Sequence, residues 1–134
     1  MDAPTLLYVD DRPHVLELRK ATLESHGYCV KIASSDYTAM KMLEEASVAA
    51  VLLEYKTEGI DAEAVACHIK QRFPSIPIIL LSAYACTPER VLWLVDEHVM
   101  RSKLSERLIP AIERATRRSQ TDEIRKPASR GKSA

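Results

Sequence analysis

The strongest constraint on this sequence is an alternation between short apolar runs and longer segments with helical periodicity. The first, third and fourth runs are nearly continuous, as in strands buried on both faces of a sheet. The runs are TLLYV (5–9), YCVKIA (28–33), AAVLL (49–53), IPIILLS (76–82) and the weaker HVMR (98–101). Each is short enough to be a single strand, so we expect five strands.

Helical segments fill the gaps between these runs. The clearest is the last, where apolar residues follow an amphipathic spacing at Leu104, Leu108, Ala111, Ile112 and Ala115. We expect the other helices at 13–26, 36–46, 61–73 and from the Thr87-Pro88-Glu89 start to about residue 95, with Gly27 as a C′ glycine and Thr87 as an N-cap. Strands alternating with helices predict an α/β fold with a parallel sheet and helices on both faces. In such sheets the ligand site lies at the carboxyl ends of the strands.

Composition restricts the function classes. A chain of 134 residues with 46% hydrophobic residues can form one domain with one core. No stretch has the length of a membrane span, and the N-terminus lacks the basic region of a signal peptide. The three cysteines, Cys29, Cys67 and Cys86, are far apart, which is typical of buried thiols in a reducing cytoplasm.

The charge is unevenly distributed along the chain. Residues 117–134 contain six basic and two acidic residues, a net +4, so residues 1–116 carry −4 of the overall zero. This tail has one large apolar residue, Ile124, and is predicted to be a disordered, solvated end. We therefore expect a domain at 1–116 followed by a tail at 117–134. The balanced total charge argues against wholesale nucleic-acid binding, although the tail could contact an acidic partner.

Polar residues stand where the predicted strands end. The carboxylates would repel one another unless a hard cation such as Mg²⁺ joined them, and a hydroxyl and a cationic side chain could hold the oxygens of a phosphoryl group. Taken singly, each residue is more simply a turn residue, a cap or a surface charge. The residues are Asp10 and Asp11 after the first strand, Glu54 after the third, Ser82 at the end of the fourth, and Arg101 or Lys103 after the fifth.

The segments LLYVDDRP, AVLLEYKTEGIDA and IPIILLSAY resemble the receiver (response-regulator) domain of bacterial two-component signalling, over residues 5–116. The resemblance implies a flavodoxin-like sheet of strand order 2-1-3-4-5. It implies that Asp10 and Asp11 hold Mg²⁺ and that Ser82 is the switch hydroxyl. Glu54 stands where receivers carry the aspartate that accepts phosphate.

The sequence departs from the receiver pattern at several places. Glutamate is longer than aspartate by one methylene, about 1.5 Å, which suits phosphoryl transfer poorly and partly imitates a phosphorylated aspartate. Counting back from the last helix puts Arg101 at the usual lysine position, whereas counting forward from Ser82 puts Lys103 there. We favour the backward count, because the chain is a few residues shorter than the receiver pattern between residues 94 and 98. With Arg101, His98 takes the place of the switch aromatic. Trp93, at helical spacing with Arg90 and Val91, is expected either to pack or to belong to the face that meets partners, and Tyr84, near the active edge, is expected to shape the same face.

These observations predict a stand-alone, atypical receiver (a pseudo-receiver) that is not an enzyme, works in the bacterial cytoplasm by protein–protein interaction and does not need conventional aspartate phosphorylation. The resemblance implies a histidine kinase or another signalling protein as partner and a homodimer through the helix-4 to helix-5 face. Three alternatives remain. Glu54 could accept phosphate with Mg²⁺, the acidic cluster could form a small Mg²⁺-dependent hydrolase, or the tail could bind nucleic acid.

Overall fold

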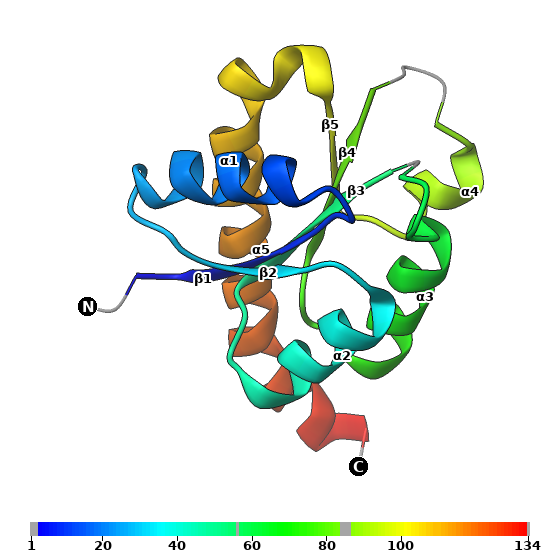
Figure 1. The fold of residues 1–134 in the computed structure, drawn as a ribbon. Coiled ribbons are helices and arrows are strands. Elements are labelled where there is room, and N and C mark those ends of the chain that lie inside the picture. Colours follow the sequence, from blue (N-terminus) through cyan, green and yellow to red (C-terminus); the bar gives the residue numbers. More distant parts are fainter. Residues whose placement is uncertain (1–2, 56, 84–86, 134) are drawn as a thin grey trace.

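The computed structural model describes residues 3–55, 57–83 and 87–133, with side chains as far as Arg118. Five parallel strands form one sheet in the order β2-β1-β3-β4-β5. They are β1 (Thr5–Val9), β2 (Cys29–Ala33), β3 (Ala50–Glu54), β4 (Ile78–Ser82) and β5 (Glu97–Met100). The sheet confirms the predicted α/β class and strand order, and each strand lies within two residues of its predicted bounds (Figure 1).

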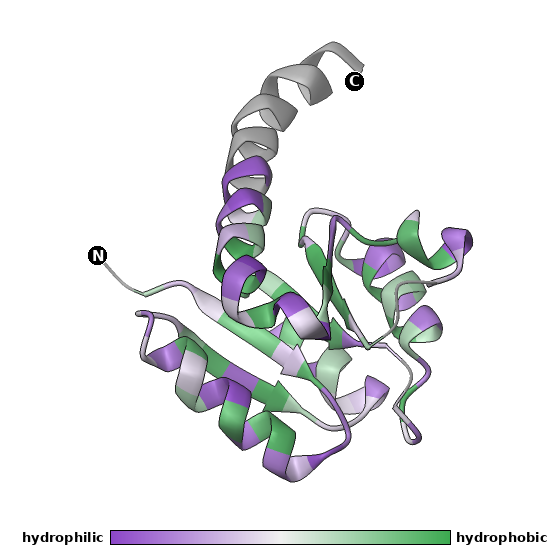
Figure 2. Cartoon of the chain, turned by 90° about the horizontal axis from the view of Figure 1, so that it is seen from above, coloured by the Kyte–Doolittle hydropathy of each residue, from purple (hydrophilic) through white to green (hydrophobic). Residues whose placement is uncertain are grey.

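Helices cover both faces of the sheet, as predicted. One core cluster joins alternate strand residues such as Leu6, Leu52 and Leu81 to the helices α1 (Pro13–Glu24) and α5 (Leu104–Ser133). The other cluster joins the intervening strand residues to α2 (Asp36–Glu45), α3 (Ala62–Arg72) and α4 (Glu89–Leu92). Because both faces are buried, the strands are apolar almost throughout, and Figure 2 shows much green on the strands, whereas the helices carry both green and purple residues.

Local sequence explains most helix ends. Pro13 begins α1, where its missing N–H has no intrahelical partner to lose. The side chains of Ser35 and Asp61 accept hydrogen bonds from backbone N–H groups and cap α2 and α3. Gly27 has a φ of +92° in the turn after α1, a conformation that glycine adopts readily. It lies two residues beyond the C-cap Ser25, one position later than predicted.

The end of the chain differs from the sequence-based expectation. Composition predicts a disordered tail from residue 117, but the backbone of α5 continues as helix to Ser133. Arg118 also contacts the core domain, because its Nη2 donates to Glu97 Oε2 at 2.6 Å and to the Asp96 carbonyl at 3.2 Å. Burial opposes ionisation of Glu97, yet hydrogen bonds from Arg114 and Arg118 hold the pKa of its carboxyl below the ordinary value. The ion pair between Arg118 and Glu97 therefore extends the contacts with the domain past the predicted boundary at residue 116.

Within the described residues, no helix combines the length and the hydropathy that a membrane span requires.

Candidate functional site

The carboxyl edge of the sheet gathers the predicted polar residues. Glu54 is the last residue of β3 and pairs in register with Leu81, while Ser82 ends β4 and pairs with Met100 of β5. Asp10 directly follows β1, and its N–H donates to the Ala33 carbonyl at the end of β2. Because parallel strands end at a common edge, residues far apart in the chain lie together there.

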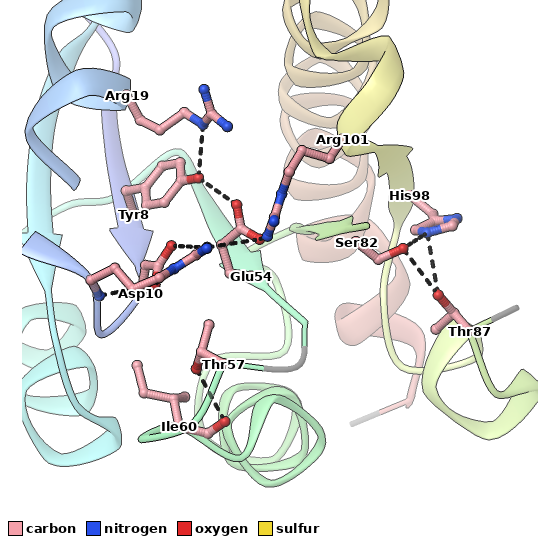
Figure 3. Close-up of polar contacts among 11 residues, drawn as sticks. Tyr8, Asp10, Arg19, Glu54, Thr57, Ile60, Ser82, Thr87, His98 and Arg101 are labelled. Atoms are coloured by element: carbon pink, nitrogen blue, oxygen red, sulfur yellow. Dashed lines mark hydrogen bonds and ion pairs between the residues drawn. The ribbon is translucent and has the colours of Figure 1, made fainter. Parts of the chain in front are cut away.

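Glu54 is completely buried, and both of its carboxylate oxygens accept hydrogen bonds. The Tyr8 hydroxyl donates to Oε1 at 2.9 Å, and Arg101 Nη2 donates to Oε2 at 2.5 Å. Arg19 Nε donates to the Tyr8 hydroxyl at 3.2 Å and continues the network to α1 (Figure 3). Burial, together with the neighbouring Glu54 charge, raises the pKa of the Tyr8 phenol well above its ordinary value. Tyr8 is therefore a neutral donor to this carboxylate.

Strand alternation explains why Tyr8 meets Glu54. Tyr8 pairs in register with Leu52, and both belong to the core cluster beneath α1 and α5. Glu54 lies two residues after Leu52, so its side chain leaves the strand on the same face of the sheet. Sequence reasoning missed Tyr8, although its position one residue before the end of a buried strand could have suggested this contact.

The backward count from the last helix favours Arg101 over Lys103, and in the structure Arg101 is the residue that lies against Glu54. Arg101 begins a short 3-10 helix, η1 (Arg101–Lys103), directly after β5. This position brings its guanidinium to the sheet edge, while the Nε atom is buried and has no hydrogen-bond partner among the described residues.

Asp10 is paired with a residue that sequence reasoning did not select. The backbone N–H and Nε of Arg12 each donate to Asp10 Oδ1 at 3.1 Å, and its Nη2 donates to Oδ2 at 2.8 Å. The same Nη2 lies 3.6 Å from Glu54 Oε2, so one guanidinium stands between the two carboxylates. The hydrogen bond with Asp10 raises the pKa of Arg12, which therefore keeps its charge.

The three carboxylates predicted to share Mg²⁺ do not come together as expected. Among the residues described, no group of three or more Asp, Glu, His or Cys side chains is placed to hold a metal ion. Arg12 separates Asp10 from Glu54, and Asp11 Oδ2 accepts from the Gly59 N–H at 2.6 Å. Asp11 Oδ1, however, is buried without a hydrogen-bond partner in the described part of the chain. A free carboxylate oxygen beside Asp10 fits a hard cation, so a site made of Asp10 and Asp11 is chemically suitable for Mg²⁺.

Ser82 belongs to a second cluster, nearer α4. Its Oγ is buried and lies 3.0 Å from Nε2 of His98, and the Thr87 hydroxyl donates to it at 3.3 Å. Burial lowers the pKa of His98, which favours the neutral imidazole. Thr87 was predicted to cap α4, but Pro88 occupies the N-cap and the Thr87 side chain contacts Ser82. In Figure 3 this cluster lies to one side of the Glu54 network.

The remaining predicted residues are placed as follows. Trp93 is the C-cap of α4, and its side chain is 82% exposed. Leu92 beside it is also exposed. Tyr84 and Cys86 lie outside the described residues. Of the other cysteines, Cys29 is exposed and Cys67 is half-buried, so the prediction of a buried thiol is wrong for Cys29.

Comparison with known proteins identifies the domain. Residues 6–101 match the family model of the response regulator receiver domain. A putative NtrX-like response regulator of Rickettsia felis is 35% identical over 81 residues, which are 59% of this chain and 17% of that protein. The transcriptional regulatory protein GlrR of Escherichia coli K12 is 31% identical over 86 residues, 64% of this chain and 19% of that protein. The chain thus spans less than a fifth of the length of either relative.

Solved structures show the same fold. The response regulator TrrA of Thermotoga maritima, crystallised with Mg²⁺–BeF, superposes with a TM-score of 0.76 at 29% identity, covering 84% of this chain and 98% of that one. NtrX of Brucella abortus gives a TM-score of 0.84 at 21% identity, covering 94% of this chain and 29% of that one.

Proposed function

Because the chain belongs to the response regulator receiver domain family of two-component signalling, we propose that it is an atypical receiver that acts without conventional aspartate phosphorylation. Its output is a protein–protein interaction, and its partner is a histidine kinase or another signalling protein. The observation that carries this proposal is the state of Glu54, which is fully buried and hydrogen-bonded at both oxygens.

The Glu54 network opposes phosphoryl transfer in two ways. A nucleophilic carboxylate needs an oxygen that is free and aligned with the incoming phosphorus, and small errors in position are costly. Oε1 is held by Tyr8 and Oε2 by Arg101, with Arg12 close to the same oxygen. Both oxygens would have to leave these donors before transfer. The longer glutamate side chain instead places its own negative charge against Arg101.

This ion pair supports a domain that adopts one signalling state without added phosphate. In receivers, the cationic side chain after the fifth strand would form an ion pair with the negative charge at the end of the third strand. Here Glu54 and Arg101 form that contact within the unmodified chain at 2.5 Å. An equilibrium between two states of the domain shifts toward the state that contains the stabilising contact.

The proposed output surface is the α4–β5–α5 face. The cluster of Ser82, Thr87 and His98 joins the end of β4 to the start of α4 and to β5. A change at this cluster would therefore alter the position of α4, where Leu92 and the 82% exposed Trp93 face outward. We propose that a signalling partner, or a second copy of the chain, binds there in the cytoplasm.

A second candidate function is a receiver that is still modified at Glu54. The buried, unpartnered Asp11 Oδ1 favours it, because Asp10 and Asp11 would hold the Mg²⁺ that neutralises charge on a phosphoryl group. TrrA of Thermotoga maritima, one of the similar proteins of known structure, was crystallised in complex with Mg²⁺–BeF. A small Mg²⁺-dependent hydrolase and nucleic-acid binding by the tail stay predictions from the sequence.

Intact mass spectrometry after incubation with acetyl phosphate and Mg²⁺ tests the proposal. We expect no mass gain on the native protein and one phosphoryl group on Glu54→Asp, because aspartate retreats from Arg101 and restores the usual acceptor. A gain on the native protein that is lost in Glu54→Gln would overturn the proposal in favour of the second candidate. If neither the native protein nor Glu54→Asp is modified, the site no longer transfers phosphate at all and the phosphate-independent function stands.

A further inference from the structure

Arg12 is hydrogen-bonded to the carboxylate of Asp10, which a divalent cation bound at this edge would need as a ligand. Its guanidinium and backbone N–H take up both oxygens of Asp10, which is completely buried. The Arg12 side chain itself is 35% exposed. It can therefore rotate into solvent without opening the core, whereas Asp10 cannot move away from the sheet edge.

Asp11 is the second carboxylate at this place. Its Oδ2 is fixed by the Gly59 N–H, and its Oδ1 is buried and lacks a hydrogen bond from any described residue. A buried acceptor without a partner is costly, so this oxygen favours any cation that can reach it. Asp10 is the adjacent carboxylate, and two neighbouring carboxylates with water suit Mg²⁺.

We propose that Arg12 is a tethered competitor of divalent cations at the Asp10–Asp11 pair. Arg12 must leave Asp10 before the pair can take Mg²⁺, since one carboxylate cannot hold a bidentate guanidinium and a metal ion at the same oxygens. The apparent affinity for Mg²⁺ is then reduced by the small fraction of time for which Arg12 is away. The domain therefore has two alternative states: in one, Asp10 is paired with Arg12, and in the other, Asp10 and Asp11 bind a metal ion.

This inference concerns the same edge of the sheet as the proposed function but does not rest on it. Cation competition at Asp10 holds whether or not Glu54 accepts phosphate, and its test uses no phosphodonor. Failure of one proposal therefore leaves the other intact.

The test is a Mg²⁺ titration of the full chain by isothermal calorimetry, with Mn²⁺ electron paramagnetic resonance as a second readout. Arg12→Gln removes the fork and the charge, and we expect it to bind Mg²⁺ at least tenfold more tightly than the native protein, which corresponds to about 1.4 kcal/mol. Arg12→Lys keeps the charge but loses the bidentate geometry, and we expect an intermediate affinity. Circular dichroism checks that both variants are folded.

Two controls separate competition from a general effect of charge. Arg19→Gln removes a nearby positive charge that contacts Tyr8 and neither aspartate, and we expect native affinity. The double variant Arg12→Gln/Asp11→Asn should lose the gain, because the free carboxylate oxygen is gone. Equal affinities of the native protein and Arg12→Gln would refute the proposal. It would also be refuted if Arg19→Gln bound Mg²⁺ as tightly as Arg12→Gln.

Discussion

The hydroxyl of Tyr8 offers a direct test of how the buried Glu54 charge is stabilised. Tyr8→Phe removes one oxygen atom and leaves the ring, so it creates almost no cavity. The lost interaction is the 2.9 Å hydrogen bond to Glu54, in which both partners are completely buried. Water cannot readily replace the donor there, and the remaining cationic partners, Arg101 and Arg12, both lie at the other carboxylate oxygen of Glu54, Oε2.

The expected loss follows from the kind of hydrogen bond. Bonds to charged groups contribute about 1.5–3 kcal/mol to stability, compared with about 1 kcal/mol for neutral pairs. The second contact of the hydroxyl, from Arg19, is only part-buried, so water can satisfy that donor. We therefore expect Tyr8→Phe to lower the free energy of unfolding by about 2 kcal/mol. With a slope of about 2 kcal/mol per M, the urea midpoint falls by about 1 M.

Urea unfolding followed by circular dichroism measures this loss. Tyr37→Phe is a matched control, because Tyr37 is 73% exposed and the same atom is removed from its ring; we expect a change within about 0.5 kcal/mol. In a Glu54→Gln background, Tyr8→Phe should cost only about 1 kcal/mol, because the acceptor is then neutral. A Tyr8→Phe protein as stable as the native one would show that the hydrogen bond does not hold Glu54, and our account of the network would be wrong.

Two further predictions concern the second cluster and Asp11. Burial lowers the pKa of His98, so the unfolded chain binds more protons than the folded protein once the pH falls below about 6.5. The stabilising contribution of neutral His98 should therefore be complete above this pH and decline as the pH falls toward the lower pKa of the folded protein. Urea unfolding curves at several pH values should show a shallower decline in stability for His98→Gln. An unchanged pH dependence in this variant would contradict the assignment to His98. Gly59→Ala would place a Cβ 2.6 Å from Asp11 Oδ2. We expect a loss of about 1–2 kcal/mol in urea unfolding from this crowding, and native stability would show that Asp11 relaxes freely.

The placement of the strand-end residues could be predicted because it depends on one simple rule. Parallel strands end at one edge, so Asp10, Glu54 and Ser82 had to lie near that edge once the strands were located. Counting back from the last helix favoured Arg101 over Lys103 as the cation, but its contact with Glu54 depends on the short η1 helix, which the sequence did not predict.

The hydrogen-bond partners of the buried acids Asp10 and Glu54 also could not be predicted from the sequence. The sequence indicates only that Arg12 is a loop residue before Pro13, and its contact with Asp10 depends on how the chain turns into α1. Tyr8 is predicted to be a core residue of β1, which it is, and its hydroxyl gains a role only because β1 and β3 pair in the observed register. The composition of residues 117–134 predicts disorder because they have little apolar surface, whereas the backbone of α5 continues as helix past residue 116. Composition could not indicate the ion pair between Arg118 and Glu97.

The sequence by itself determined the α/β class, the strands and the edge of the sheet that carries the polar residues. Hydrophobic periodicity is a local property, so it can be recognised without knowing which segments pack together. Only the tertiary structure decided which charges meet. Glu54 is paired with Arg101 and Tyr8, and Asp10 is paired with Arg12, through contacts that depend on side-chain directions at a crowded sheet edge. Burial then makes these contacts strong, because a charge removed from water needs a partner within a few ångströms.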